Sequence, residues 1–287
     1  MNKQQLSLII LALAAVAGLY FFGPTVAPGK KAPTEAAVDS SHQHFDVEHY
    51  KESAISALSP QRQQLIAGLE NNLKEGHAAG TNDQTIHIYH QLASFWRDTV
   101  PNPLLHFYFA GKAAELDNTE KSLTFAAHSI LGYLPFAQNQ DEQSWLAGKG
   151  KELFDKALAI NPANDSSVVG AGGCIIYGAS ADQGATMQGI MKIREVVEKD
   201  STNLFAQYML GIGGLVSRQY DKAVLRFEKV VKGQPDNLEA LFKLAEVNEL
   251  MENKPKAIYW YGRIKEKVKE EGLKTEIEKR IQELKKP

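Results

Sequence analysis

Three histidines near the N-terminus are the first candidate metal ligands in the sequence. His42, His44 and His49 follow the pattern H-x-H-x4-H, and the carboxylates of Asp46 and Glu48 lie between them. Imidazole and carboxylate groups can bind zinc or copper where the backbone holds them in a fixed geometry. His42 and His44 are expected in a linker, so we interpret the cluster as solvated histidines. A metal-binding module using His42, His44 and His49 stays the alternative, and no cofactor is assigned.

A glycine-rich stretch, Val168–Gly173, comes directly before the single cysteine, Cys174. Gly170 and Gly172 fit the first two glycines of the dinucleotide-binding pattern G-x-G-x-x-G, but Ile175 occupies the third position and helical segments surround it. We interpret these glycines as sites of close helix packing and Cys174 as a small buried hydrophobe. The sequence contains no P-loop, G-x-S-x-G or H-E-x-x-H motif. It therefore assigns no catalytic residue, and we predict that the protein is not an enzyme.

The composition is that of a folded protein with no preference for nucleic acid. Apolar residues make up 44% of the 287 residues and charged residues 23%. The net charge of -2 gives no electrostatic reason to expect nucleic acid as a partner.

The N-terminal residues 1–22 carry an apolar run, Leu6–Phe22, that predicts a transmembrane anchor. A spanning helix needs ~17–25 apolar residues, and the run is at the lower limit of that range. A cleaved signal peptide is the alternative, but no small-x-small site follows the bulky pair Phe21–Phe22. Lys3 favours an exported body, whereas Lys30–Lys31 favour the opposite orientation. We predict a single-pass protein of the inner (plasma) membrane with its body on the exported, periplasmic side.

Residues 23–44 contain many Pro and Gly residues without apolar periodicity, and predict a flexible linker. From Phe45 onward the apolar residues follow helical spacing, so the body is predicted to be all-α. We expect a helical hairpin over 45–80, an array of helix pairs over 81–271 and a C-terminal capping helix over 272–287.

An internal period of 34 residues organises the C-terminal half of the array. The residues that recur or fit the pattern are Leu210, Gly211, Ala223, Phe227 and Pro235, then Leu244, Ala245, Ala257 and Tyr261. Tetratricopeptide repeats (TPRs) have the pattern W-x2-L-G-x2-Y, A-x3-F and P over 34 residues. The chain resembles this family, with the best repeats at 204–237 and 238–271, although Gln207 and Gly214 occupy the Trp and Tyr positions.

Earlier units match the pattern less closely. One is expected to pair Thr85–Arg97 with Leu104–Leu116, and the next begins with Glu120–Leu134, followed by an enlarged turn at Ala137–Gln143. A further unit is expected over Ser166–Asp200, and the capping helix over Lys274–Lys286.

The resemblance implies an α-solenoid whose first helices line a binding groove for other proteins. Carried over to this sequence, the groove positions are Phe205, Tyr208, Ile212, Leu215, Glu239, Phe242, Glu246 and Glu249. One TPR subclass binds a C-terminal carboxylate through Lys and Asn, but Tyr208 and Ile212 occupy those positions here. We therefore predict a scaffold whose groove binds an amphipathic helix or extended peptide with apolar anchors and basic flanks. Self-association into a homo-oligomer is the remaining alternative.

Overall fold

The structure, a computed structural model, describes residues 45–80, 82–179 and 182–286, and every regular element in these ranges is helical. The chain divides into residues 1–44 and residues 45–287, and the first of these units lies outside the described residues. In chain order the helices are α2 (Val47–Ser56), α3 (Pro60–Ala79), α4 (Asn82–Ser94), η1 (Phe95–Thr99), α5 (Pro103–Asp117), α6 (Glu120–Tyr133), η2 (Leu134–Phe136), α7 (Gln140–Ile160), α8 (Asp165–Gly178), α9 (Gln183–Lys199), α10 (Leu204–Val216), α11 (Tyr220–Gly233), α12 (Leu238–Leu250), α13 (Lys254–Lys267) and α14 (Glu271–Lys285).

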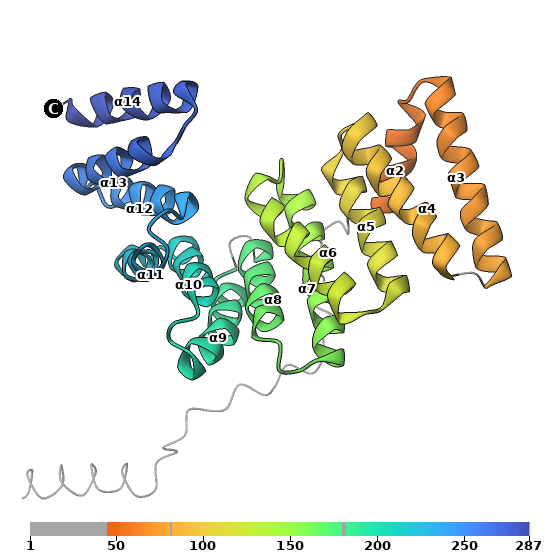
Figure 1. Cartoon of the computed structure of the whole chain (residues 1–287), viewed down its shortest axis with the longest axis horizontal. Helices are drawn as coiled ribbons and strands as arrows, with labels where there is room; N and C mark the ends of the chain where they lie inside the picture. The colour runs from red at the N-terminus through yellow and green to blue at the C-terminus, as the bar shows by residue number, and fades with distance from the viewer. Residues whose placement is uncertain (1–44, 81, 180–181, 287) are drawn as a thin grey trace, which may run out of the picture. The chain divides into compact units, whose positions relative to one another are not determined.

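The helices of residues 45–287 pack in chain order, each against the next. The antiparallel pairs are α4 with α5, α6 with α7, α8 with α9, α10 with α11, and α12 with α13 (Figure 1). Further contacts join alternate helices, so that α6 meets α8, α8 meets α10 and α5 meets α7. This arrangement confirms the predicted all-α solenoid of helix pairs.

The turn that enters the first helix of a pair has the same form three times. Asn164, Asn203 and Asn237 are the N-caps of α8, α10 and α12, and each side chain accepts a hydrogen bond from the backbone N–H three residues later, at 3.0, 2.9 and 3.0 Å. An N-cap amide oxygen satisfies one of the backbone donors that a helix leaves unpaired at its start. The same side-chain chemistry therefore sets the start of successive repeats.

The turn inside each of the two best repeats is also equivalent. Arg218 and Glu252 lie 34 residues apart and both adopt the left-handed backbone conformation, with φ of 58° and 56°. The following residues, Gln219 and Asn253, donate their backbone N–H to Gly214 and Asn248 at 2.7 and 2.8 Å. The 34-residue period of the sequence therefore corresponds to a turn that repeats with the same backbone conformation and hydrogen bond.

The repeat pattern is explained by helix packing. Ala223, Phe227, Ala245 and Ala257 are fully buried. A Cβ atom at Gly211 would lie 2.5 Å from the ring of Phe227, so only glycine lets α10 approach α11 this closely. The glycines of α8 act in the same way, because a Cβ atom at Gly170 would lie 2.2 Å from the Phe154 ring. The prediction of close packing at Gly170 and Gly172 is confirmed.

Two buried clusters form the core of residues 45–287. One joins α2, α3, α4 and η1 to one face of α5 and includes the buried Trp96. The other runs from α5 to Ile277 and Ile281 of α14. Trp145 of α7 packs against both clusters.

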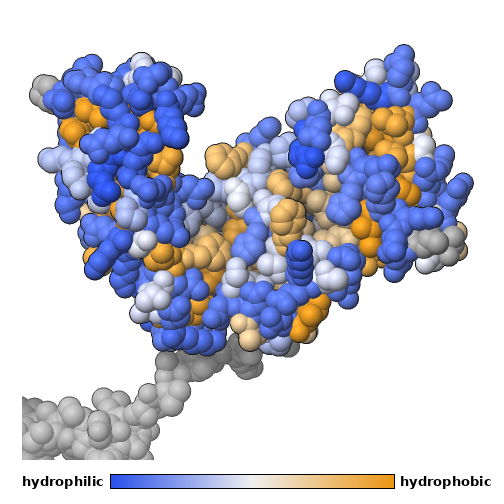
Figure 2. All heavy atoms as spheres, viewed as in Figure 1, coloured by the Kyte–Doolittle hydropathy of each residue, from blue (hydrophilic) through white to orange (hydrophobic). Residues whose placement is uncertain are grey.

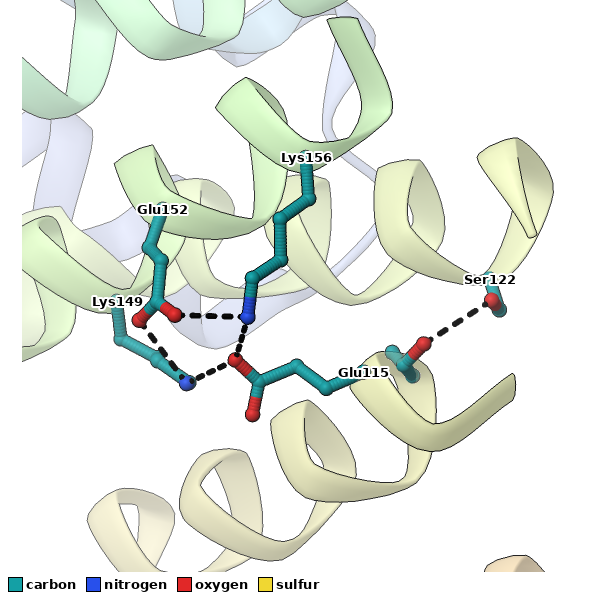
Figure 3. Close-up of polar contacts among 6 residues, drawn as sticks. Glu115, Ser122, Lys149, Glu152 and Lys156 are labelled. Carbon is teal, nitrogen blue, oxygen red and sulfur yellow. Dashed lines mark hydrogen bonds and ion pairs between the residues drawn. The ribbon is translucent and has the colours of Figure 1, made fainter. Parts of the chain in front are cut away.

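An ion-pair network connects α5 to α7 (Figure 3). Lys149 donates to Glu115 at 2.7 Å and to Glu152 at 3.1 Å. Lys156 pairs with Glu152 at 2.8 Å and also contacts Glu115. Two lysines and two glutamates therefore neutralise one another where α5 and α7 come together.

Two expected boundaries differ from the structure. The enlarged turn expected at Ala137–Gln143 is shorter, because Asn139 caps α7 by accepting from the backbone N–H of Glu142 at 2.9 Å. The helix expected to continue to Arg97 changes into the π-helical η1, which buries Phe95 and Trp96.

The predicted location, a single-pass protein of the inner membrane with a periplasmic body, requires a correction. In the ranges that the structure describes, no helix is long and apolar enough to cross a membrane. The predicted anchor, residues 6–22, and the predicted linker, residues 23–44, lie outside those ranges.

Candidate functional site

A groove of 630 Å³ crosses the first helices of four successive pairs. Its walls come mainly from α6 and η2, α8, α10 and α12, with one residue of α11. Its aromatic lining residues are His128, Phe136, Tyr177, Phe205, Tyr208 and Phe242. We call this site the aromatic groove. Grooves of this size with an apolar lining and a few polar groups are typical sites for a ligand or a partner segment.

Ring contacts hold the lining of the aromatic groove in place. His128 lies against Phe154 at 4.9 Å and against Phe205 at 5.5 Å, and its Nε2 is 2.9 Å from the Ser166 hydroxyl. Tyr208 packs edge-on against the buried Phe227 at 5.6 Å. Because Phe154 and Phe227 lie in the core, the side chains of His128 and Tyr208 are positioned before any ligand arrives.

Phe136 differs from the other lining residues because 72% of it is exposed. It belongs to η2, which begins at Leu134 directly after α6 and contains Pro135. An aromatic ring that is so exposed is available for contact with a partner.

The electrostatic character of the aromatic groove is negative. Burial raises the pKa of Tyr177 and of Tyr208, and the nearby carboxylates of Glu239 and Glu246 raise both further. Lys243 also lines the groove, but it pairs with Glu246 at 2.8 Å. Glu239 has no cation within ion-pairing distance among the described residues, so its charge is not offset there.

The two tyrosines offer hydroxyl groups to a ligand. Neither Tyr177 nor Tyr208 forms a side-chain hydrogen bond to another described residue, and both line the groove. A phenol hydroxyl can donate and accept, so each can bind a polar group of a partner.

The structure brings together four of the eight predicted groove residues, namely Phe205, Tyr208, Glu239 and Phe242. Ile212 is 3% exposed and belongs to the core, and Leu215 packs against the same core. Helix α10 is apolar around nearly its whole circumference, so its periodicity does not separate the groove face from the core face.

The two remaining glutamates lie outside the groove. Glu246 is exposed and pairs with Lys243. Glu249 accepts from the Tyr261 hydroxyl at 2.6 Å and pairs with Arg280 of α14. The capping helix therefore engages the carboxylate that was predicted to meet a partner.

The repeat pattern did not identify His128, Phe136 or Tyr177 as groove residues. His128 and Tyr177 belong to the units that match the repeat pattern less closely, and Phe136 lies in a turn beyond the pattern. Their assignment depends on how neighbouring helix pairs stack.

No metal site is found in the part of the chain that the structure covers, where no group of three or more His, Cys, Asp or Glu residues could hold an ion. His49 is exposed on α2, while His42 and His44 lie outside the described residues.

The repeat type follows from the two best units, where 34-residue spacing, equivalent turns and buried motif residues coincide. The chain has the tetratricopeptide repeat fold. Gln207 and Gly214, which depart from the TPR pattern, are both buried inside the array.

Several solved structures are similar to this chain. No family model matches the sequence, and no curated protein matches it. A crystal structure of MamA is 16% identical, over 68% of this chain and 93% of that chain, with a TM-score of 0.38. A tetratricopeptide repeat protein from Parabacteroides merdae is 14% identical, over 76% and 86%, with a TM-score of 0.40. The TPR2AB domain of yeast Sti1, in a complex with pHSP90, is 11% identical, over 78% and 100%, with a TM-score of 0.32.

Proposed function

We propose that this protein is an interaction scaffold that binds a segment of a partner protein in the aromatic groove. The observation that carries the proposal is the lining of that groove, where aromatic side chains from four helix pairs surround a 630 Å³ space. Aromatic residues contribute much of the binding energy at protein interfaces because they bury large areas with few rotatable bonds.

The groove favours a partner segment with apolar anchors and basic flanks. The apolar anchors would contact Phe136, Phe205 and Phe242, and lysine or arginine flanks would lie near Glu239 and Glu246. An amphipathic helix provides such anchors at spacings of three and four residues. Complementary charge selects the partner and speeds its association.

The proposal is tested with two synthetic helical peptides that share one leucine stripe. One peptide has lysine flanks and the other has glutamate flanks, and each carries a fluorescent label. Binding to the full-length chain is measured by fluorescence anisotropy at low ionic strength, where exposed charges are least screened. We expect the lysine-flanked peptide to bind through the aromatic groove.

The apolar part of the site is tested by Phe136→Ala, with Phe125→Ala as its matched control. Both rings are exposed, at 72% and 76%, so neither change disturbs the core, and Phe125 lies outside the aromatic groove. Phe136→Ala should weaken binding of the lysine-flanked peptide by up to ~1.5–3 kcal/mol, the value for burying one large apolar side chain. Phe125→Ala should leave the affinity unchanged.

The electrostatic part is tested by Glu239→Lys, with Glu276→Lys on α14 as a control of equal charge change. Glu239→Lys should weaken binding of the lysine-flanked peptide about tenfold, because an attraction becomes a repulsion. Equal loss in both variants, or no binding of the lysine-flanked peptide to the wild type, would overturn the proposed function.

A further inference from the structure

A second groove, of 720 Å³, lies between α9 and α11. Helix α10 forms its floor through Leu210, Gly214 and Ser217. The aromatic groove is lined by other residues of α10, among them Phe205 and Tyr208. The two grooves therefore use different faces of α10. We call the second site the basic groove.

Apolar side chains are exposed within the basic groove. Met187 of α9 is 44% exposed and Leu225 of α11 is 60% exposed, and the half-buried Ile190 lies on the same face of α9 as Met187. Large apolar residues that line one concave site from two helices indicate a contact surface. The face shown in Figure 2 mixes hydrophobic and hydrophilic residues over α9 and α10, whereas α14 is covered mainly by hydrophilic residues.

The charged residues of the basic groove are nearly all cations. They are Arg194, Lys222, Arg226, Lys229 and Lys232, against one carboxylate, Glu228. Among the described residues, only Arg194 of these five has a carboxylate within 4.0 Å, and its partner Glu198 lies at 3.6 Å. Positive charge along this groove is therefore largely uncompensated by the protein itself.

Arg226 is held in place by a buried residue. Its Nη1 donates to Oε1 of Gln207 at 2.8 Å, and Nε2 of Gln207 donates to the Ser201 carbonyl at 2.8 Å. Gln207 is fully buried and occupies the position where the TPR pattern has Trp. Burial lowers the pKa of Arg226, and the positive charge of Arg194 lowers it further, so the two guanidinium groups are near enough to repel each other.

We propose that the basic groove binds an acidic amphipathic helix of a partner protein, with apolar residues on Met187 and Leu225 and carboxylates beside the basic rim. Charge complementarity selects this occupant, because the exposed apolar residues line the same groove as four cations of α11 and one cation, Arg194, of α9. A nucleic acid would leave the apolar residues without a counterpart. This inference does not depend on the proposed function of the aromatic groove, whose charge is opposite.

The glutamate-flanked peptide described above is the probe, and the full-length chain is titrated with it at low ionic strength. We expect this peptide to bind and its affinity to fall as salt is added. Lys229→Glu should weaken binding of this peptide about tenfold, because the attraction between Lys229 and a peptide carboxylate becomes a repulsion. Lys279→Glu, an exposed lysine of α14, makes the same charge change away from the groove and should leave the affinity unchanged.

The apolar contribution is tested by Leu225→Ser, with Leu250→Ser as the matched control. These leucines are 60% and 50% exposed, so both variants are expected to fold, and circular dichroism checks that they do. Leu225→Ser should weaken binding of the glutamate-flanked peptide about tenfold, because apolar contacts contribute to the affinity in addition to charge attraction. Leu250→Ser should bind like the wild type.

Three kinds of result would overturn the inference, namely failure of the peptide test, binding of a lipid surface and dimerisation of the chain. One is absence of binding of the glutamate-flanked peptide to the wild type, or binding that Lys229→Glu and Lys279→Glu weaken equally. Another is binding of phosphatidylserine vesicles that Lys229→Glu abolishes while the peptide does not bind, which would assign the groove to a lipid surface. The third is a concentration-dependent dimer in sedimentation that Lys229→Glu abolishes while the peptide does not bind, which would assign it to a second copy of this chain.

Discussion

At the scale of single residues, the ion-pair network of Glu115, Lys149, Glu152 and Lys156 makes stability depend on pH. Burial of Glu152 opposes its ionisation, but hydrogen bonds from Lys156 and Lys149 outweigh burial and lower its pKa from 4.5 to about 2. The pKa in the folded state is thus below its value in the unfolded chain. The resulting stabilisation is present above pH 4.5 and is lost as the pH falls from 4.5 toward about 2.

Glu152→Gln removes this titration. We expect the melting temperature of the wild type to fall more steeply below pH 4.5 than that of Glu152→Gln. Glu198→Gln is the control, because Glu198 is exposed and, among the described residues, its one ion pair is with Arg194, at 3.6 Å. Parallel melting curves for wild type and Glu152→Gln across this range would contradict the account.

Cys174 gives a second prediction at this scale. It is 1% exposed, and burial raises the pKa of its thiol, so the reactive thiolate is scarce at neutral pH. Native protein should therefore resist alkylation by iodoacetamide, while protein unfolded in guanidinium should react fully. Mass spectrometry measures both states, and fast alkylation of the native protein would contradict the burial. The sequence-based interpretation of Cys174 as a buried hydrophobe agrees with its position in α8.

The repeat pattern predicted part of the candidate site. The 34-residue register, read through the resemblance to TPR proteins, predicted eight groove residues, and four of them, Phe205, Tyr208, Glu239 and Phe242, line the aromatic groove. The same register does not reveal that the neighbouring core covers Ile212. That burial depends on helix stacking, which a helix as uniformly apolar as α10 does not encode in its periodicity.

At the scale of elements, the close approach of α10 and α11 depends on Gly211. A Cβ atom there would meet the Phe227 ring at 2.5 Å, whereas a Cβ atom at Gly262 of α13 would meet nothing within 4 Å. Gly211→Ala should destabilise the protein by about 1–3 kcal/mol through overpacking. Gly262→Ala should stabilise it by about 0.5–1 kcal/mol, because alanine favours a helix interior.

Urea unfolding followed by circular dichroism compares the two glycine variants. Opposite signs of the change in unfolding free energy support tight packing at Gly211. Equal stabilisation by both substitutions would show that α10 and α11 separate easily and would contradict the described contact.

The positions of the helices were largely predictable, because the residues that begin and end a helix are close to it in the sequence. The sequence placed single helices close to α4, α5, α6 and α14 as the structure has them, and one unit over Ser166–Asp200, where α8 and α9 lie. The start of α7 was placed too late because the N-cap at Asn139 was not recognised. The π-helical η1 was not predicted, because it arises from packing of Phe95 and Trp96 in the core rather than from any breaker residue.

At the scale of the whole molecule, two grooves of opposite charge use different faces of α10. The aromatic groove is lined by first helices and carries the field of Glu239 and Glu246. The basic groove lies between the second helices α9 and α11 and carries five cations. If both proposals hold, the chain binds two partner segments of opposite charge, and charge repulsion keeps each segment out of the other groove.

The solenoid type was predictable at this scale, whereas the grooves were not. A 34-residue period specifies helix pairs, but groove depth depends on contacts between pairs, such as those of His128 with Phe205 across α6 and α10. Such contacts join residues far apart in the sequence, and no local pattern specifies them.

The measurement that most directly tests the central claim is photo-crosslinking of the lysine-flanked peptide to the full-length chain. The peptide carries a benzophenone at its central apolar position, and mass spectrometry maps the crosslinked residues. The account predicts crosslinks in η2, α10 and α12, at Phe136, Phe205, Tyr208 or Phe242. Crosslinks confined to α4 and α5, or to the basic groove between α9 and α11, would contradict the claim that the aromatic groove is the binding site.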